Sequence, residues 1–180
     1  MKFKIERCNK EDAEMIARVV VMAIHRDWDE NREMREIFTA LSARADSQYS
    51  YMNALKAVTP EGEIAGIIVA YDGGKLHELH RAFREEYERV TGKPVFKLTE
   101  ETVPGEWYLD SIAVFPKFRG QGVAHALIKA AIENISDGLV PGLLCAKDNP
   151  MAQKLYESMG FKFVGERPFF GEMMNHLTLS

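Results

Sequence analysis

The stretch of sequence that most limits how this 180-residue chain can fold runs from Leu109 to Ala124. Its first part, through Val114, is mostly apolar and indicates a buried strand. A loop with glycine at positions 120 and 122 follows, and a helical pattern begins at Val123. Backbone N–H groups at a helix N-terminus attract anions, and glycines remove side chains that would keep an anion away. The stretch therefore predicts a turn that binds a diphosphate.

Two familiar phosphate-binding motifs fit this loop less well. The chain contains no G-x-x-x-x-G-K-[ST] sequence, which excludes a P-loop. A dinucleotide-binding turn would need a third Gly or Ala where this chain has His125, and it would follow an early strand, whereas this loop lies late in the chain. Arg119, in contrast, places a positive charge directly beside the glycines.

The periodicity of apolar residues over the rest of the chain predicts a mixed α/β fold in a single domain, residues 1–180. Asn9 and Asp12 resemble a capping box before the first helix. We expect helices at residues 16–24, 34–41, 76–92, 123–135 and 150–159. Strands are expected at residues 2–6, 52–58, 63–71, 107–114, 143–146, 161–164 and 173–179. Antiparallel pairs come first and a βαβ-like unit follows, so helices should cover both faces of the sheet.

Composition excludes several classes of function. The formal net charge is −4, which argues against nucleic-acid binding as the main function. The two cysteines, Cys8 and Cys145, are too few and too far apart for a disulfide framework or a Cys-based zinc site. The chain begins without the apolar segment of a secretory signal, and it has no apolar run of membrane-spanning length. We therefore expect a soluble, cytoplasmic protein that does not act on membranes.

Two motifs at a fixed separation resemble those of one family. Arg119, Gly122 and Ala124 match the pattern R/Q-x-x-G-x-G/A, and the segment from Asn149 through Tyr156 to Phe161 matches a second signature. Together they resemble the GNAT superfamily of acyl-CoA-dependent N-acyltransferases, closely over residues 107–165 and more loosely before. The resemblance implies a central mixed sheet of about six to seven strands flanked by helices. The helix at residues 76–92 is then an addition between the third and fourth strands.

The resemblance also implies acetyl-CoA as the acyl donor and requires no metal. Backbone groups of Ile112, Ala113 and Val114 would pair with the pantetheine arm of CoA as an added strand does. The pyrophosphate would lie on the loop, in contact with Arg119, Gly120, Gln121, Gly122, Val123 and Ala124. The family also places an Asn at position 149 near the cofactor phosphates, although an Asn before a Pro is a helix N-cap in any protein.

Acyl transfer to an amine needs a base, an acid and a donor to the developing oxyanion. The resemblance assigns the acid to Tyr156, which would protonate the CoA sulfur; the alternative is a packing tyrosine on an amphipathic helix. Asp110 stands inside a predicted strand, where Asp is disfavoured, and the resemblance implies that an acidic residue on this strand can act as the base. A solvent-facing carboxylate or a sheet-edge ion pair is the alternative for Asp110, and Glu106 is a weaker candidate for the role of base. The oxyanion donor would be a strand N–H group, expected at Ile112.

The site for the acceptor amine is the part of the protein that the sequence determines least. In the family it is built by the first two helices, the hairpin strands and the C-terminal strands, which here contain Trp28, Asp29, Glu30, Tyr49, Tyr51, Asn53, Phe169 and Phe170. A solvated helix face and core aromatic residues are the alternatives for these positions. The helix at 76–92 either covers the acceptor site or forms a dimer contact. His77 and His80 are expected to be packing and surface residues on this helix, and Cys145 a core residue.

The sequence therefore predicts an N-acetyltransferase that acts on a primary amine of a small molecule or a peptide. The alternative is a non-catalytic acyl-CoA-binding module that senses cofactor level. A homodimer is compatible with either function.

Overall fold

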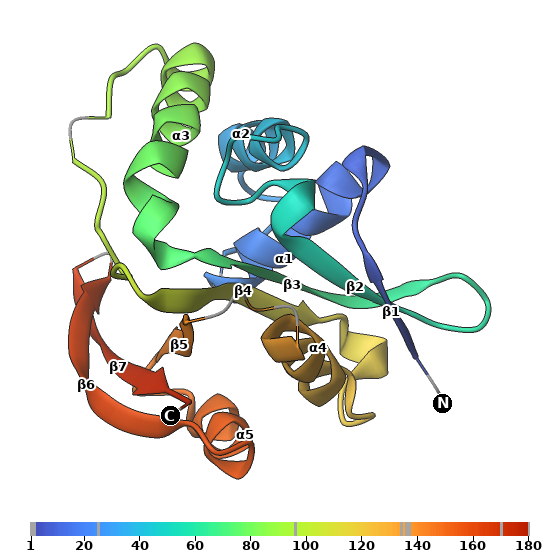
Figure 1. Cartoon of the computed structure of the whole chain (residues 1–180). Coiled ribbons are helices and arrows are strands. Elements are labelled where there is room, and N and C mark those ends of the chain that lie inside the picture. Colours follow the sequence, from blue (N-terminus) through green and yellow to red (C-terminus); the bar gives the residue numbers. More distant parts are fainter. Residues whose placement is uncertain are drawn as a thin grey trace.

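Seven strands form one mixed sheet in the computed structural model, which describes residues 3–24, 26–95, 97–133, 135, 138–169 and 171–179 (Figure 1). Their order across the sheet is β1-β2-β3-β4-β5-β7-β6. The strands are β1 (Lys4–Arg7), β2 (Ala54–Val58), β3 (Ile64–Asp72), β4 (Glu106–Val114), β5 (Val140–Cys145), β6 (Lys162–Phe169) and β7 (Glu172–Thr178). Only β4 and β5 pair in parallel; all other described neighbours are antiparallel. The expected α/β class and mixed sheet are confirmed.

The helices lie on both faces of the sheet. They are α1 (Ala13–Ala23), α2 (Arg32–Ser42), α3 (Leu76–Thr91), α4 (Val123–Glu133) and α5 (Pro150–Ser158). Figure 1 shows α1 and α2 above the sheet, with α3 beside α2, and α4 and α5 below it. The helix between the third and fourth strands is therefore present, as expected. No helix in the described ranges combines the length and the apolar character needed to cross a bilayer.

Local sequence signals set several element ends. Asn9 and Asp12 form the expected capping box, in which the Asn9 backbone N–H donates to Asp12 Oδ2 at 2.8 Å. Gly92 ends α3 in the left-handed conformation, at φ +68°. The strand expected from residue 52 begins at Ala54 instead, because Ser50 caps a short 3-10 turn over Tyr51–Asn53. β5 starts earlier than expected, at Val140.

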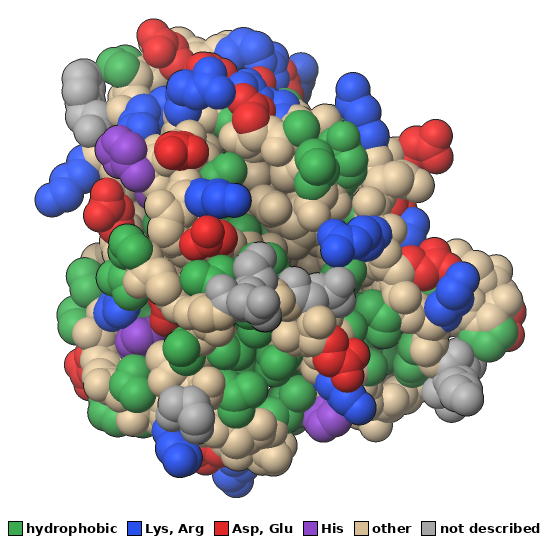
Figure 2. Space-filling model, in the orientation of Figure 1, with side chains coloured by type: hydrophobic (Ala, Val, Ile, Leu, Met, Phe, Trp, Pro, Cys, Tyr) green, Lys and Arg blue, Asp and Glu red, His purple; other side chains and the backbone are tan. Residues whose placement is uncertain are grey.

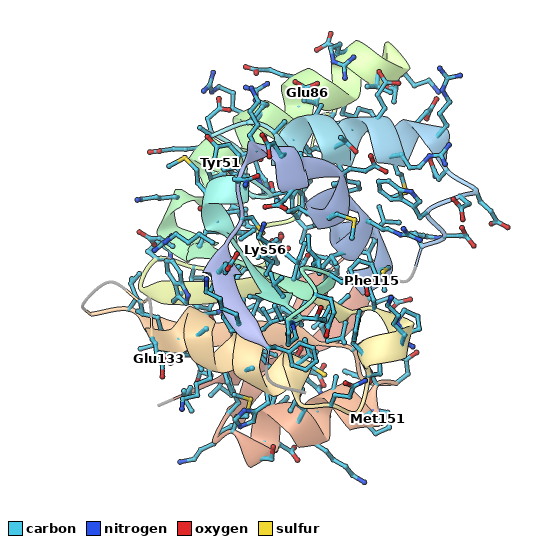
Figure 3. The ribbon with its side chains drawn as sticks, turned by 90° about the vertical axis from the view of Figure 1, so that its right-hand side faces the viewer. Tyr51, Lys56, Glu86, Phe115, Glu133 and Met151 are labelled. Atoms are coloured by element: carbon cyan, nitrogen blue, oxygen red, sulfur yellow. The ribbon has the colours of Figure 1, made fainter. Side chains whose placement is uncertain are left out.

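Two apolar cores lie on opposite faces of the sheet. One packs α1, α2 and α3 against β3 and β4, and the other packs α4 and α5 against β2, β3 and β5. β3 is buried along most of its length, as its continuous apolar sequence predicts for a central strand. Lys56 of β2, labelled in Figure 3, pairs with Asp12 at 2.7 Å and so ties the sheet to the start of the first helix.

A β-bulge in β4 interrupts the pairing with β3. Val69 lies opposite Ser111 and Ala70 lies opposite Leu109, so Asp110 is the extra residue with no partner in β3. A bulge changes which face the following residues point to. Leu109 and Ile112, three positions apart, consequently pack into the same core. Asp110 is thus a strand residue whose position is set by an irregularity of the ladder.

Candidate active site

β4 and β5 separate partway along their length, and the separation opens a cleft. They pair only from Glu106 to Tyr108 on β4, after which β5 continues beside β7. The cleft has a volume of about 1080 Å³. Its walls include Asp110, Ile112, Ala113, Val114, Arg119, Ala124, Asn149 and Tyr156. Both predicted catalytic residues and most of the predicted cofactor-binding residues therefore meet in one space.

The edge of β4 that faces the cleft pairs with no other described strand beyond Tyr108. Phe115 donates its N–H to Ala65 of the β3 side at 2.9 Å, which makes this a hydrogen-bonded pair. In an antiparallel ladder such pairs recur every second residue, so Ala113 and Ser111 also bond toward β3. The N–H and C=O groups of Ile112 and Val114 then point away from β3. The part of β4 beyond Tyr108 can consequently accept another extended chain along its edge.

The glycine-rich loop presents N–H groups that donate to no backbone acceptor in the described part of the chain. Gly120 and Gly122 have φ values of +71° and +80°, and a Cβ at either position would meet nothing within 4 Å. Across the described ranges, the backbone N–H groups from Gly120 to Ala124 donate to no other backbone group. Gln121 instead uses its side chain, donating to Lys117 O at 3.0 Å. Val123 is buried and anchors the start of α4, so the loop is fixed at one end.

Arg119 and Asn149 line the cleft, and each side chain also forms a hydrogen bond with the backbone of a nearby residue. Arg119 Nε donates to Val114 O at 3.2 Å, which holds the guanidinium beside the end of β4. Asn149 caps α5, since its Oδ1 accepts the Ala152 N–H at 3.1 Å. The interpretation of Asn149 as a helix cap is therefore confirmed. Asn149 also lies on the cleft wall, and its contact with the cofactor phosphates stays a prediction.

Tyr156 lies on α5 with only 8% of its surface exposed, and its ring packs edge-on against Phe161. Burial raises the pKa of its hydroxyl group, and the nearby Cys145 thiol adds to the shift. The hydroxyl therefore stays protonated across the neutral range. Cys145 is itself a buried core residue, as expected, and also lines the cleft; burial raises the pKa of its thiol.

Asp110 accepts two hydrogen bonds at the cleft wall. The Tyr71 hydroxyl donates to Oδ2 at 2.6 Å, and the Ser111 hydroxyl donates to Oδ1 at 2.7 Å. Burial raises the pKa of the Asp110 carboxyl group, and these two bonds oppose the rise because they favour the charged form. Asp110 is therefore not a solvent-facing surface carboxylate.

Glu106, the weaker candidate base, lies outside the cleft walls. It is buried where β4 and β5 still pair, 2.5 Å from His176 Nε2 on β7 and 2.5 Å from the Thr102 hydroxyl. These contacts join β4 to β7 and to the segment that precedes β4. Glu106 therefore connects these segments beneath the site and does not line the cleft.

Most expected acceptor contacts lie elsewhere than predicted. Asp29 and Glu30 are exposed and, like Trp28 and Tyr51, do not line the cleft. Asn53 instead holds the loop before it, donating to Ser47 O and Gln48 O. Phe169 does line the cleft, whereas Phe170 lies outside the described residues. The aromatic walls that sequence reasoning missed are Phe38 of α2 and Phe83 and Tyr87 of α3.

Glu101 is a further residue that the motifs did not indicate. It precedes β4, is only 5% exposed, and the charge of Asp110 contributes to raising its pKa. His80 of α3 is buried, in line with the packing interpretation, and His77 is exposed. In the ranges that the structure describes, no three His, Cys, Asp or Glu residues are grouped so that they could hold a metal ion.

Residues 19–161 match the sequence profile of the acetyltransferase (GNAT) family. The chain belongs to this family. The GNAT fold is also found in a solved structure described as an acetyltransferase, which is 32% identical, covers 97% of both chains and has a TM-score of 0.81. An N-acetyltransferase from Staphylococcus aureus Mu50 is 25% identical over 97% of this chain and 99% of its own, also with a TM-score of 0.81.

More distant GNAT structures share the fold alone. The NatC complex bound to Gag peptide and CoA is 18% identical over 99% of this chain and 98% of its own, with a TM-score of 0.61. Among curated proteins, an uncharacterised protein of Mycobacterium leprae (strain TN) is 37% identical over 67 residues. That match spans 37% of this chain but only 18% of the length of the relative.

Proposed function

We propose that this GNAT protein transfers an acetyl group from acetyl-CoA to a primary amine of a small molecule or a peptide. One observation carries the proposal: a single cleft contains the open edge of β4, two residues of the glycine-rich loop segment, and both Tyr156 and Asp110. These are the parts that direct acyl transfer needs, namely a place for the donor, an acid and a base.

The residues present suit an acyl-CoA. The N–H groups between Gly120 and Ala124 have no backbone partner among the described residues and would hold the pyrophosphate, with Arg119 adding a positive charge. The Ile112 N–H and C=O groups and the Val114 N–H group match the alternating amides of a pantetheine arm, while the Val114 C=O accepts from Arg119 Nε. When bound, acetyl-CoA would supply a thioester whose carbonyl carbon is open to attack by an amine.

Three groups of the chain are candidates for the base, the oxyanion donor and the acid. Asp110 is the candidate base, because its carboxylate reaches the cleft and is oriented by Tyr71 and Ser111. The Ile112 N–H, which points toward the cleft, is the candidate donor to the carbonyl oxygen as that oxygen gains charge. The neutral Tyr156 hydroxyl is the candidate donor to the departing sulfur.

The raised pKa of Tyr156 affects how that donation works. A thiol has an ordinary pKa near ~8.5, well below that of a buried tyrosine. Tyr156 therefore stabilises a thiolate mainly as a hydrogen-bond donor. Full proton transfer from Tyr156 becomes favourable only when the thiolate forms beside it in the same buried space, where burial also disfavours the charge of the thiolate. The expected contribution of a positioned acid is about 10²-fold or more in rate.

The Tyr156→Phe variant tests the enzyme against a non-catalytic acyl-CoA sensor. We expect CoA release in the presence of an amine panel to fall about 100-fold, with acetyl-CoA affinity within about twofold of the parent. Tyr51→Phe is the matched control, because Tyr51 does not line the cleft. A parent protein that binds acetyl-CoA but releases no CoA with any amine would support the sensor instead.

A further inference from the structure

An aromatic surface lines the part of the cleft that helices form. Phe38 of α2 and Phe83 and Tyr87 of α3 all lie on the cleft wall. Residues four apart share one face of a helix, and the Phe83 and Tyr87 rings are stacked, with 6.1 Å between their centroids and 20° between their planes. The Phe38 ring centroid lies 6.2 Å from that of Phe83. The three rings therefore form one continuous surface across two helices.

These rings are packed against the protein on one side and face the cleft on another. Phe83 and Tyr87 are half-buried and contact the core that α1, α2 and β3 share. Phe38 is buried, and the Tyr49 ring, which does not line the cleft, packs edge-on against it with 5.2 Å between centroids. An apolar group of a ligand that covers the open side of the rings gains by leaving water.

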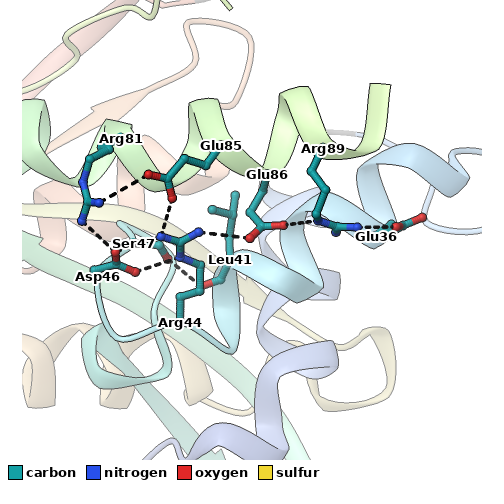
Figure 4. A network of polar contacts seen from close by, with 9 residues as sticks. All are labelled: Glu36, Leu41, Arg44, Asp46, Ser47, Arg81, Glu85, Glu86 and Arg89. Atoms are coloured by element: carbon teal, nitrogen blue, oxygen red, sulfur yellow. Dashed lines mark hydrogen bonds and ion pairs between the residues drawn. The ribbon is translucent and has the colours of Figure 1, made fainter. Parts of the chain in front are cut away.

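Ion pairs hold α3 in place beside α2 (Figure 4). Glu85 and Glu86 of α3 have carboxylate oxygens 2.7 and 3.1 Å from the guanidinium nitrogens of Arg44, which follows α2. Arg89 of α3 pairs with Glu36 of α2 at 3.0 Å. The aromatic surface consequently has its position before any ligand binds, and a contact with a preorganised surface costs less ordering.

The lining residues between Met22 and Tyr87, which we call the helical wall, carry little charge. Besides the three rings, the apolar members are Met22, Ala23, Ile24, Met34 and Ile37. Among the described residues of the helical wall, the one charged side chain is Arg26, a cation. The carboxylates of the cleft belong to other parts of its wall, namely Asp110 on β4, Asp148 after β5 and Glu172 on β7. A positive charge against the helical wall would leave water without a counter-ion, which is costly.

The cleft has room for two ligands. Its volume of about 1080 Å³ exceeds the range of roughly 300–1,000 Å³ that is usual for the pocket of one small molecule. The expected donor site follows the edge of β4 and the glycine-rich loop, at the start of α4. The helical wall is therefore the part of the cleft that remains for the acceptor.

On the basis of the acetyltransferase function proposed above, we propose that Phe83 and Tyr87 determine which acceptor is used. Their rings bind the apolar body of a primary monoamine and exclude diamines and other polycations. Phe38 completes the aromatic surface from α2. The two determinants belong to α3, the helix between the third and fourth strands, so the specificity comes from a part of the chain outside both sequence motifs.

The test compares hexylamine with pentane-1,5-diamine, which differ only in whether the far end is a methyl or an ammonium group. Affinities are measured calorimetrically without acetyl-CoA, and kcat/KM is measured separately from CoA release. The parent should favour hexylamine about 100-fold in both measurements, because the far ammonium of the diamine would lie unpaired against the helical wall.

A carboxylate placed among the rings should change the preference. Tyr87→Glu supplies a counter-ion for the far ammonium and removes apolar surface, so the preference for hexylamine should fall about tenfold or more. His77→Glu is the matched control. It adds the same charge to the same helix, at an 81% exposed position that does not line the cleft, and should keep the ratio of the parent.

Removing one ring should weaken the binding of the apolar body. Tyr87→Ala should lower the affinity for hexylamine about tenfold, whereas Tyr87→Phe keeps the ring and should retain most of that affinity. Leu79→Ala separates this effect from a loss of stability, because Leu79 of α3 packs against the same core without lining the cleft. It should bind hexylamine as the parent does.

Equal binding of the two amines by the parent, or no binding of hexylamine, would overturn the inference. So would an unchanged ratio in a Tyr87→Glu variant whose circular dichroism matches the parent. Tight binding of the diamine that is lost in Glu172→Gln would place its far ammonium at β7 and would also overturn it.

The two proposals can fail separately. If CoA release proceeds equally well with both amines, the proposed function stands and this inference falls. If the binding preference and its dependence on Tyr87 are observed but no amine supports CoA release, the apolar subsite stands and the proposed function falls.

Discussion

The Glu106 carboxyl group of β4 fills the space above Gly142 of β5. A Cβ atom at position 142 would overlap that carboxyl group, which also contacts His176 and Thr102. This packing lies at the last point where β4 and β5 pair, directly before the strands separate to form the cleft. Glycine at position 142 thus leaves room for the Glu106 carboxyl group at the point where the cleft begins.

Replacing Gly142 by alanine should destabilise the protein. The added methyl group must displace Glu106 from its two hydrogen bonds, and overpacking of this kind costs about 1–3 kcal/mol. Urea unfolding of Gly142→Ala measures the loss. Val140→Ala on the same strand is the control, since Val140 is 41% exposed and should change stability by less than about 0.5 kcal/mol. Equal stabilities for the two variants would contradict the packing described.

Gly122→Ala should weaken acetyl-CoA binding. Its φ of +80° disfavours any other residue, so alanine would distort the turn whose N–H groups are expected to hold the pyrophosphate. Gly62→Ala is a close control, because Gly62 has φ +86° and open space around it but lies in the turn between β2 and β3. Both variants should lose similar stability, whereas only Gly122→Ala should lose affinity, by about tenfold. Unchanged affinity in Gly122→Ala would remove the loop from the donor site.

An ion-pair network joins α3 to α2 and to the loop after it, and Arg44 is its centre (Figure 4). Arg44 contacts Asp46, Glu85 and Glu86 at 2.8, 2.7 and 3.1 Å, and the pairing lowers the pKa of Asp46 to about 2. The charged surface around this network is visible at the top of Figure 2. Because α3 supplies aromatic walls of the cleft, the network also fixes that side of the site.

Arg44→Met should therefore destabilise the protein by about 1 kcal/mol, a modest value because the network is partly screened by water. Three carboxylates would remain without their shared cation. The loss, measured by thermal unfolding, should shrink in 1 M salt. Lys129→Met removes an exposed pair with Glu133 at 3.9 Å and should have little effect. An Arg44 variant as stable as the Lys129 variant would show that the network contributes nothing.

His80 should make stability depend on pH. Burial and the charge of Arg84 lower its pKa to about 4, so the folded protein keeps this side chain neutral. The unfolded chain binds a proton below about pH 6.5, which means that this contribution is present above pH 6.5 and is lost as the pH falls toward 4. The parent should therefore lose more stability than His80→Leu between pH 7 and 4.5. His77→Leu, at an 81% exposed position, should follow the parent; parallel curves for His80→Leu and parent would contradict the assignment.

The sequence allowed correct prediction of features that depend on a few adjacent residues. The Asn9 capping box, the Gly92 helix end and the Asn149 cap are of this kind, because short-range hydrogen bonds and backbone conformation set them. The Gly-rich loop was also found at the start of a helix, since its spacing is local. Single-domain organisation, a homodimer and a cytoplasmic location stay predictions.

Features that depend on how distant segments meet were not predictable. The bulge at Asp110 is defined by the register of β4 against β3, which no property of β4 alone determines. Glu101 lies in a polar stretch without periodicity, and nothing in the adjacent residues indicates that its side chain is buried. For the same reason Asp29 and Glu30, which the family resemblance places among the expected acceptor contacts, lie away from the cleft.

Calorimetric titration with acetyl-CoA, and separately with NAD, tests the central claim most directly. A loop that holds a CoA pyrophosphate beside the open edge of β4 predicts micromolar binding of acetyl-CoA and no detectable binding of NAD. Folded protein that binds neither acetyl-CoA nor another acyl-CoA, or that prefers NAD, would contradict the account.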